Sequence, residues 1–217
     1  MPPSRQRSSG LTSPVGSPCT GERAYSPGEV LLVHAAAGGV GSAAVQLGLA
    51  AGATVIGVTR GARKAEIVRK LGAQLVIDRE EESAIETVKA FTGGLGADVV
   101  FDPVGGPSWF ESTKCVAFEG RLLIIGFAGG EILSQPLNHP LVKNYSILGI
   151  NSGLYTALRP EIVQEAFAGL ADLVAHGAIR PLIGERVPME DAPRALQDLD
   201  DGVTVGRYVV MLDGSVK

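Results

Sequence analysis

The sequence has few of the features typical of secreted, membrane or nucleic-acid-binding proteins. Its two cysteines, Cys19 and Cys115, are far apart and neither belongs to a CxxC pair, so they predict neither a disulfide framework nor a structural zinc site. No apolar run approaches the ~18 residues of a membrane span. Lysines and arginines form no large cluster and the net charge is −4, which argues against a nucleic-acid partner. We therefore expect a reduced, cytoplasmic setting without membrane or nucleic-acid contacts.

Aromatic residues are also scarce, at 5% of the chain, which disfavours an all-β fold rich in aromatic strand residues. What remains is 217 residues of which 45% are hydrophobic, enough for one sizeable core with an appendage. The segment 1–25 stands apart, because it is rich in Ser, Pro, Gly and Arg and lacks periodic apolar residues. We expect it to be disordered. Its prolines also argue against an amphipathic transit peptide.

From Glu29 onward, short apolar runs alternate with helical patterns and turn residues. The expected strands are Val30–His34, Thr54–Thr59, Leu75–Asp78, Asp98–Asp102, Arg121–Gly126 and Ser146–Ile150, and the expected helices between them are Val40–Ala51, Ala62–Leu71, Glu82–Phe91 and Pro107–Ala117. The strand runs are continuously apolar, as in parallel strands covered by helices on both faces. This alternation predicts an α/β fold with a doubly wound parallel Rossmann sheet.

The pattern changes after Ile150. A helix is expected over Pro160–His176, followed by the strand Ile183–Val187, a short helix over Met189–Leu199 and the strand Arg207–Leu212. This C-terminal β-α-β tail does not obviously extend the sheet. We expect a cofactor domain over residues 26–155 and a C-terminal helix and tail over 156–217 that pack on another domain.

The strongest chemical motif lies between the first strand and the first helix. Ala36-x-Gly38-x-x-Gly41 has the spacing of a dinucleotide fingerprint, with alanine at the first glycine position. Gly38 would let the backbone approach a pyrophosphate, and Gly41 would let helix and strand pack closely. The N-terminus of the helix would present free N–H groups to the phosphates. The alternative is a glycine-rich turn with no ligand, which this strand-to-helix context disfavours.

The end of the second strand indicates which dinucleotide. NAD enzymes place an acidic residue there for the ribose hydroxyls, whereas this chain has Thr59 and Arg60, followed by Arg63 and Lys64. Cations near a helix N-terminus meet an unfavourable dipole, a cost that an anionic ligand offsets. The cluster therefore favours NADP(H) over NAD(H), although a solvated basic helix face is the alternative reading.

Other chemistries lack their motifs. No GxSxG elbow, no GxxxxGK[ST] loop and no TyrxxxLys pair occurs. His34 is expected in the core, and His139 and His176 are isolated, so no metal site is predicted. Asp78 and Asp102 end strands, where they line a cleft or simply form turns.

The run VLLVHAAAGGVGSAAVQLGLAAGATVIGVTR, together with FDPVGG, GRLLIIGFAGG and the closing GRYVVML, resembles the medium-chain dehydrogenase/reductase superfamily. The AAAGGVG form is similar to its zinc-independent quinone oxidoreductase (zeta-crystallin-like) branch. The resemblance covers about Ser26 to Leu212. It implies NADPH-dependent reduction of a quinone or an activated alkene such as an enone.

The resemblance also implies residue roles. The pyrophosphate would be held by Gly38, Gly39, Val40 and Gly41. The 2′-phosphate end would be held by Thr59 and Lys64, with Arg79 where the family often has a tyrosine. Arg60, from the basic cluster described above, is added to these cofactor-binding candidates. Gly126 and Phe127 would lie near the nicotinamide, with Ile150 and Asn151 lining the cleft beyond the sixth strand. The strand Ser146–Ile150 is a candidate homodimer edge.

The family's GroES-like N-terminal catalytic domain has no counterpart in this sequence, since residues 1–25 do not resemble it. No side chain is a convincing general acid, so we assign no catalytic residue. We expect a chain that binds NADPH but reduces quinones poorly, with exposed apolar surface on its tail. The alternatives are a non-catalytic NADP-binding subunit or nucleotide sensor, or a truncation that never folds stably.

Overall fold

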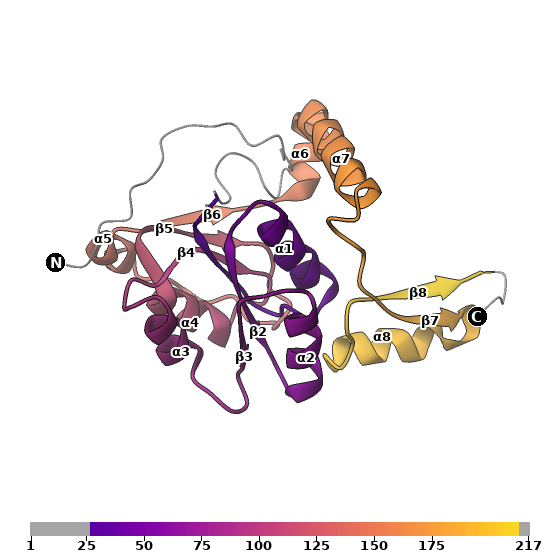
Figure 1. The fold of residues 1–217 in the computed structure, drawn as a ribbon, viewed down its shortest axis with the longest axis horizontal. Coiled ribbons are helices and arrows are strands. Elements are labelled where there is room, and N and C mark those ends of the chain that lie inside the picture. The colour runs from indigo at the N-terminus through magenta and orange to yellow at the C-terminus, as the bar shows by residue number, and fades with distance from the viewer. Residues whose placement is uncertain (1–26, 213–217) are drawn as a thin grey trace.

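The computed structural model describes residues 27–212, so the expected disordered segment 1–25 lies outside the described residues. A parallel sheet with helices on both faces forms the main body, and a smaller β-α-β tail lies beside it (Figure 1). This is the α/β doubly wound fold that the alternating pattern predicts.

The sheet is built from the six expected strands in the order β3-β2-β1-β4-β5-β6, and every pair is parallel. The strands are β1 (Val30–Val33), β2 (Thr54–Thr59), β3 (Leu75–Asp78), β4 (Ala97–Asp102), β5 (Val116–Ile124) and β6 (Ser146–Gly149). From β1 the chain winds outward to β2 and β3, and then returns to place β4 on the other side of β1. The strand order therefore reverses between β1 and β4, where open α/β sheets form a crevice at the carboxyl ends of their strands.

Helices cover both faces of the sheet, and each face has its own apolar cluster. Helices α1 (Gly39–Ala50) and α2 (Ala62–Lys70) pack on one face through residues such as Val45 and Val68. Helices α3 (Ala84–Phe91) and α4 (Pro107–Cys115) pack on the other through Val88 and Trp109. Burial on both faces explains why the strand runs are uninterrupted by polar residues.

The boundary between α4 and β5 differs from the sequence prediction. We expected a helix to Ala117 and a strand over Arg121–Gly126, but the helix ends at Cys115 and β5 runs from Val116 to Ile124. Glu119 adopts a positive φ of 57°, and the register with β4 shifts between Ala97 and Val99. The Glu-Gly pair that looks like a loop is thus an irregularity inside a strand, as bulges are.

Two short helices were missed by the periodicity argument. Helix α5 (Asn138–Lys143) contains Pro140, but the proline lies in the first turn, where its missing N–H costs no helical hydrogen bond. Helix α6 (Ser152–Leu158) begins after Asn151, whose side chain accepts a hydrogen bond from the Leu154 N–H. An Asn N-cap is the sequence signal that predicts such a helix.

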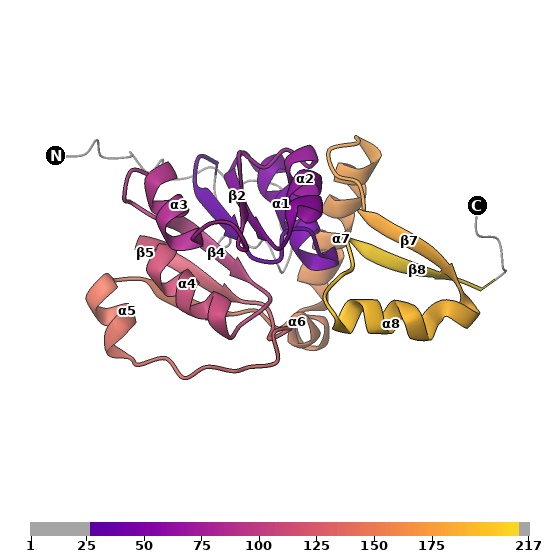
Figure 2. The same ribbon diagram turned by 90° about the horizontal axis from the view of Figure 1, so that it is seen from below.

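After helix α7 (Pro160–Ala175), the tail forms a separate two-stranded sheet. Strands β7 (Ile183–Pro188) and β8 (Arg207–Met211) are parallel, and they are connected through the 3-10 turn Met189–Asp191 and helix α8 (Ala192–Asp200). The turned view shows α8 lying beside this pair of strands, away from the main sheet (Figure 2). The tail thus does not extend the main sheet, as predicted.

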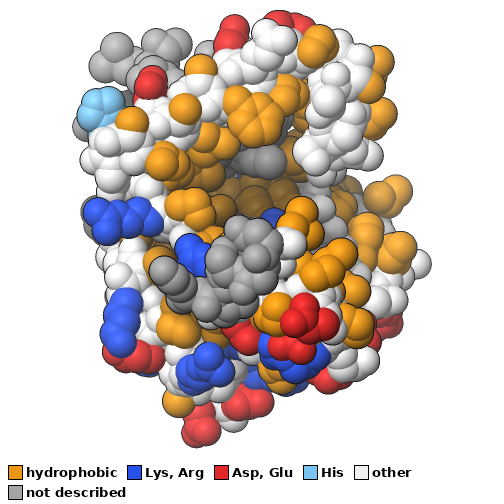
Figure 3. Space-filling view, turned by 90° about the vertical axis from the view of Figure 1, so that its right-hand side faces the viewer, with side chains coloured by type: hydrophobic (Ala, Val, Ile, Leu, Met, Phe, Trp, Pro, Cys, Tyr) orange, Lys and Arg blue, Asp and Glu red, His pale blue; other side chains and the backbone are white. Residues whose placement is uncertain are grey.

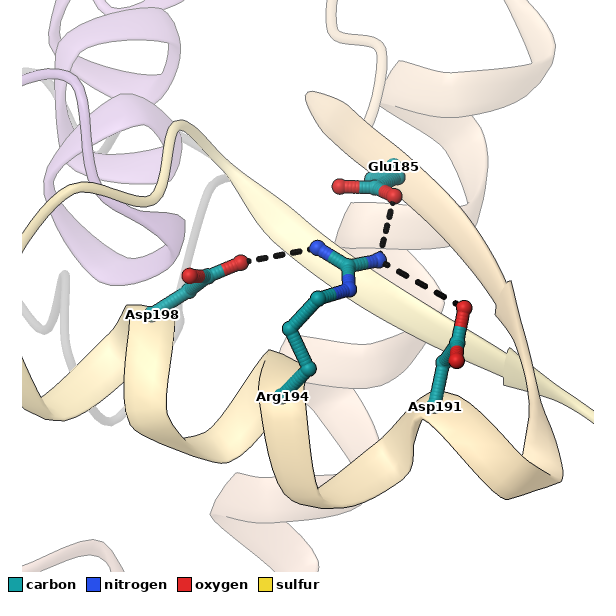
Figure 4. A network of polar contacts seen from close by, with 4 residues as sticks. All are labelled: Glu185, Asp191, Arg194 and Asp198. Atoms are coloured by element: carbon teal, nitrogen blue, oxygen red, sulfur yellow. Dashed lines mark hydrogen bonds and ion pairs between the residues drawn. The ribbon is translucent and has the colours of Figure 1, made fainter.

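A network of polar contacts lies on the surface of the tail. Arg194 of α8 donates to Glu185 of β7 at 2.6 Å and to Asp198 one helical turn on at 2.9 Å, with Asp191 at 3.9 Å (Figure 4). All four side chains are partly exposed, so this network orients α8 on β7 but adds little stability.

The apolar surface expected on the tail is present. Hydrophobic side chains stay exposed on α8 and in the segments on either side of it, namely Met189, Leu196, Leu199, Val203 and Leu212. The face of the molecule that carries the tail is hollowed, and hydrophobic side chains occupy much of the hollow (Figure 3). Patches of this kind are typical of surfaces that contact another protein or domain.

Candidate cofactor site

A cleft of about 630 Å³ lies at the carboxyl ends of the strands, between the sheet and the tail. One side is formed by the loop after β1 and the ends of β2 to β5. The other side is formed by α8 and the start of β8. The sequence-predicted residues that line the cleft are Gly38, Gly39, Val40, Gly41, Thr59, Arg60, Lys64 and Arg79. The topology thus brings these eight residues together from four separate segments.

The fingerprint loop leaves no room for side chains on the inner side of its turn. Ala35 adopts a positive φ of 50°, and its carbonyl accepts a hydrogen bond from the Gly38 N–H at 2.9 Å. A Cβ on Gly41 would lie 2.2 Å from that carbonyl oxygen, which is impossible without moving backbone. Ala36 itself is not among the residues with a positive φ, so the backbone at the first fingerprint position does not require glycine.

Four cations gather where β2 and β3 end. Arg63 and Lys64 lie in the first turn of α2, as the sequence predicts, and Arg60 and Arg79 belong to the adjoining loops. Partial burial lowers the pKa of the Lys64 ammonium, and the three arginines lower it further. The cations of this cluster repel one another, and a bound anion would relieve that repulsion.

The loops that carry these cations are fixed by a buried aspartate. Asp78, at the end of β3, accepts hydrogen bonds from the N–H groups of Gly61 at 2.8 Å and Glu80 at 3.2 Å. The Arg79 N–H also donates to the Thr59 carbonyl. Of the two readings left open for Asp78, the turn-forming one is confirmed, because its carboxylate points into the loops. Glu80 lies 3.7 Å from Arg60 and compensates part of the positive charge.

The tail closes the other side of the cleft, and sequence reasoning missed its residues. The Gly206 N–H donates to the Ala37 carbonyl at 2.7 Å, and the Lys64 ammonium donates to the Gly202 carbonyl. The side chain of Arg207 lies directly over Gly39, whose added Cβ would meet its Nε and Cδ atoms. The only sequence signal was the Gly-Arg pair that opens β8, and nothing in its spacing relates it to the fingerprint.

Four residues to which the resemblance assigns a role do not line this cleft. Ile150 is partly buried and packs against the apolar core instead. Gly126 is half-buried, and Phe127 lies against Gly105 with its ring partly exposed. Their neighbours Ala128 and Gly129 line the cleft instead. Asn151 is exposed and its side chain caps α6.

The histidines have structural partners. His34 is buried as predicted, with Nε2 3.0 Å from the Ser112 hydroxyl. His139 contacts the Tyr145 hydroxyl, and His176 contacts the Asp172 carbonyl. Within residues 27–212, no group of three or more His, Cys, Asp or Glu side chains is placed to hold a metal ion. Cys115 is buried and free, and burial raises its thiol pKa to about 12, so it is a poor metal ligand.

With this geometry established, comparison with known proteins gives the family. Residues 39–175 match the family described as zinc-binding dehydrogenase, and the chain belongs to that family. Its relatives place it in the quinone-oxidoreductase-like part of the medium-chain dehydrogenase/reductase superfamily, as the motifs predicted. Despite the family's name, the described residues offer no zinc site.

Three similar proteins illustrate the relationship. The chain is 34% identical over 186 residues to a quinone oxidoreductase-like protein 2 homolog of Nematostella vectensis, covering 85% of this chain and 51% of that protein. It is 31% identical over 194 residues to a 2-haloacrylate reductase of a Burkholderia species, covering 85% and 56%. The Escherichia coli quinone oxidoreductase, solved with NADPH, superposes with a TM-score of 0.79 at 33% identity, covering 86% and 58%. The chain thus spans about half the length of the curated relatives it matches.

The described part of the chain contains no helix long and apolar enough to cross a bilayer.

Proposed function

We propose that the cleft binds NADP(H) and that the chain is an NADPH-dependent oxidoreductase of the quinone-reductase type. The observation that carries the proposal is the cationic cluster of Arg60, Arg63, Lys64 and Arg79 beside a fingerprint loop in which Gly41 has no room for a side chain. Such a loop suits a pyrophosphate, and cations at the end of β2 suit a 2′-phosphate. The solved Escherichia coli relative carries NADPH, which supports the same assignment.

The residues fit the cofactor, with distinct tasks for each. The pyrophosphate would lie on the loop of Gly38, Gly39, Val40 and Gly41. The guanidinium of Arg207, which lies over Gly39, would face it. Thr59, Arg60, Lys64 and Arg79 would hold the 2′-phosphate end. Gly126, Phe127 and Asn151 stay proposed contacts of the nicotinamide half, although they lie outside the cleft as it stands.

Bound NADPH would supply a hydride from nicotinamide C4 to a quinone or an activated alkene. The protein would then contribute binding, orientation and exclusion of water. His34 is the one histidine in the cleft lining, and it is engaged by Ser112, so we name no catalytic residue. We expect slow quinone reduction by this chain, in the reduced, cytoplasmic setting suggested by its cysteines.

A second candidate is a non-catalytic NADP-binding subunit or nucleotide sensor that acts through a partner. The exposed apolar side chains of the tail favour it, because they suit a docking surface. In either case we divide the chain into a cofactor domain, 26–155, and a region, 156–217, whose tail packs on a catalytic domain or partner. Slow but measurable NADPH-dependent quinone reduction by the purified 217-residue chain would favour the first candidate. Turnover at rates typical of enzymes would refute the expectation that this chain is impaired. NADPH binding without turnover would favour the second.

The cofactor proposal is tested by titrating the chain with NADPH and NADH while following nucleotide fluorescence. Wild type should bind NADPH more tightly, and Lys64→Gln should weaken NADPH about 10- to 100-fold while changing NADH little, since one charge-assisted bond is lost. Lys70→Gln is the matched control, because Lys70 lies on the same helix but pairs with Glu66. Equal affinity of the wild type for both nucleotides would refute the NADP preference.

We also propose a homodimer in which the edge strand β6 of one copy, expected over Ser146–Ile150, pairs with the same strand of a second copy. Within residues 27–212 this strand ends the sheet and is only partly buried, so its outer edge can pair with a second copy. Sedimentation equilibrium should give a dimer for the wild type and a monomer for Ser146→Lys, since lysine on an edge strand opposes pairing. A monomeric wild type would exclude this interface.

A further inference from the structure

Asp102, at the end of β4, is a buried carboxylate that the cofactor assignment does not use. Its exposed fraction is only 1%, and its carboxylate accepts several hydrogen bonds. The N–H groups of Val104 and Gly105 donate to it at 2.9 and 3.0 Å. The Ser108 hydroxyl donates at 2.9 Å, and the Ser112 hydroxyl lies at 3.3 Å. A carboxylate with this many donors is held in place and in turn holds the loop that wraps around it.

The loop fixed by Asp102 is paired with the segment that follows β5. The carbonyl of Pro103 accepts from the Ala128 N–H at 3.1 Å, and that of Val104 accepts from the Gly129 N–H at 2.8 Å. All four of these residues line the cleft, whereas Asp102 itself does not. One buried side chain therefore determines the position of a whole wall of the cleft without belonging to its surface.

The carboxylate of Asp102 and its two serine partners, here called the hub, are also connected to the strand that precedes the fingerprint. His34 follows β1, its N–H donates to the Phe101 carbonyl, and its ring lies 3.0 Å from the Ser112 hydroxyl. The carboxylate, the two serines and the imidazole thus connect the ends of β1 and β4, the two strands at which the strand order reverses.

The position of this wall indicates which half of a nucleotide it serves. The cations lie at the ends of β2 and β3, on the opposite side of β1 from Pro103 and Ala128. A dinucleotide bound across the switch point has one half on each side. If the 2′-phosphate meets the cations, the nicotinamide half must lie against the wall after β4 and β5.

We propose that Asp102 is a positioning residue for the nicotinamide half of the cofactor, acting through the loop 103–106 and the paired segment 126–131. This rests on the proposed function. It predicts that disturbing Asp102 separates the two halves of the nucleotide, so that the adenosine half binds normally while the nicotinamide half loses its seat.

The experiment compares NADPH with adenosine 2′,5′-bisphosphate, which carries the 2′-phosphate but no nicotinamide. Asp102→Asn removes the charge at nearly constant volume, and its amide nitrogen cannot accept from the serines. We expect NADPH affinity to fall about 10-fold with loss of the nicotinamide fluorescence change, while the bisphosphate affinity stays within about twofold. Asp78→Asn is the matched control, because Asp78 is also a buried strand-end aspartate but fixes the cation loops. It should weaken both ligands alike.

Ser112→Ala gives a milder variant if Asp102→Asn does not fold. Ser112 does not line the cleft, so it acts only through the hub, and the same selective loss should appear at smaller size. Equal loss of both ligands in the Asp102 and Ser112 variants, or loss of neither, would overturn the proposal, since Asp102 would then serve folding alone. Failure of the wild type to bind either ligand would instead overturn the proposed function, and the positioning role with it.

Discussion

The sheet body and the β-α-β tail differ in how much of their apolar surface is buried. In the body, β1 and β2 are enclosed by helices, and their side chains are almost all inaccessible. In the tail, β7 and β8 are mostly half-exposed, and Val187 is the one fully buried hydrophobic residue of the pair. The body therefore holds itself together by apolar packing. The tail has only the β7–β8 pairing, a few buried apolar side chains and a few hydrogen bonds to the rim of the cleft.

The largest test of this contrast removes one leucine from each region. Leu32→Ala, in the centre of β1, should destabilise the chain by about 2–5 kcal/mol, because it leaves a cavity between packed layers. Leu196→Ala, on the exposed side of α8, should change the free energy of unfolding by less than about 0.5 kcal/mol. Urea denaturation followed by circular dichroism measures both. Comparable losses would mean that the tail is packed as firmly as the body.

A sharper test asks how the two regions meet at the fingerprint loop. Gly41→Ala should destabilise the protein by about 1–3 kcal/mol and abolish nucleotide binding, because its Cβ would collide with the Ala35 backbone. Gly39→Ala should leave thermal stability nearly unchanged, since its Cβ would displace only the flexible side chain of Arg207. Differential scanning calorimetry with and without NADPH separates the two effects. Equal destabilisation by both substitutions would show that Arg207 is rigidly fixed on the body.

The smallest expected effect concerns the pH dependence of the body. Burial lowers the pKa of His34, which the nearby Asp102 only partly opposes. The unfolded chain would bind a proton near the ordinary histidine pKa of about 6.5, while the folded chain resists it. The stability associated with neutral His34 is therefore present above about pH 6.5 and is lost as pH falls, by at most about 1.4 kcal/mol per pH unit. His34→Gln should flatten this slope between pH 7 and 5 in urea denaturation. A slope equal to that of the wild type would contradict the assignment.

The sequence predicts the body far better than the tail's relation to it. The signals for the body are local. Continuous apolar runs predict the strands, the spacing from Ala36 to Gly41 predicts the tight turn into α1, and the cations after Thr59 lie where the sequence puts them, at the start of α2 and in the loop before it. The placement of Arg207 over Gly39 is not local, because it depends on how β8 returns to the body over more than 150 residues. The hub at Asp102 could likewise be predicted only in part from the sequence. A strand-end aspartate predicts a turn, but its serine partners become apparent only when α4 is packed against β4.

The strand order has one further consequence. The cations that would distinguish NADP(H) from NAD(H) all lie between residues 60 and 79, whereas the wall governed by Asp102 is encoded between residues 102 and 131. The two stretches touch the same cleft but share no segment of chain. If these cations hold the 2′-phosphate, substitutions within that first stretch alone would change which dinucleotide is preferred, and the wall at the other end of the cleft would stay as it is.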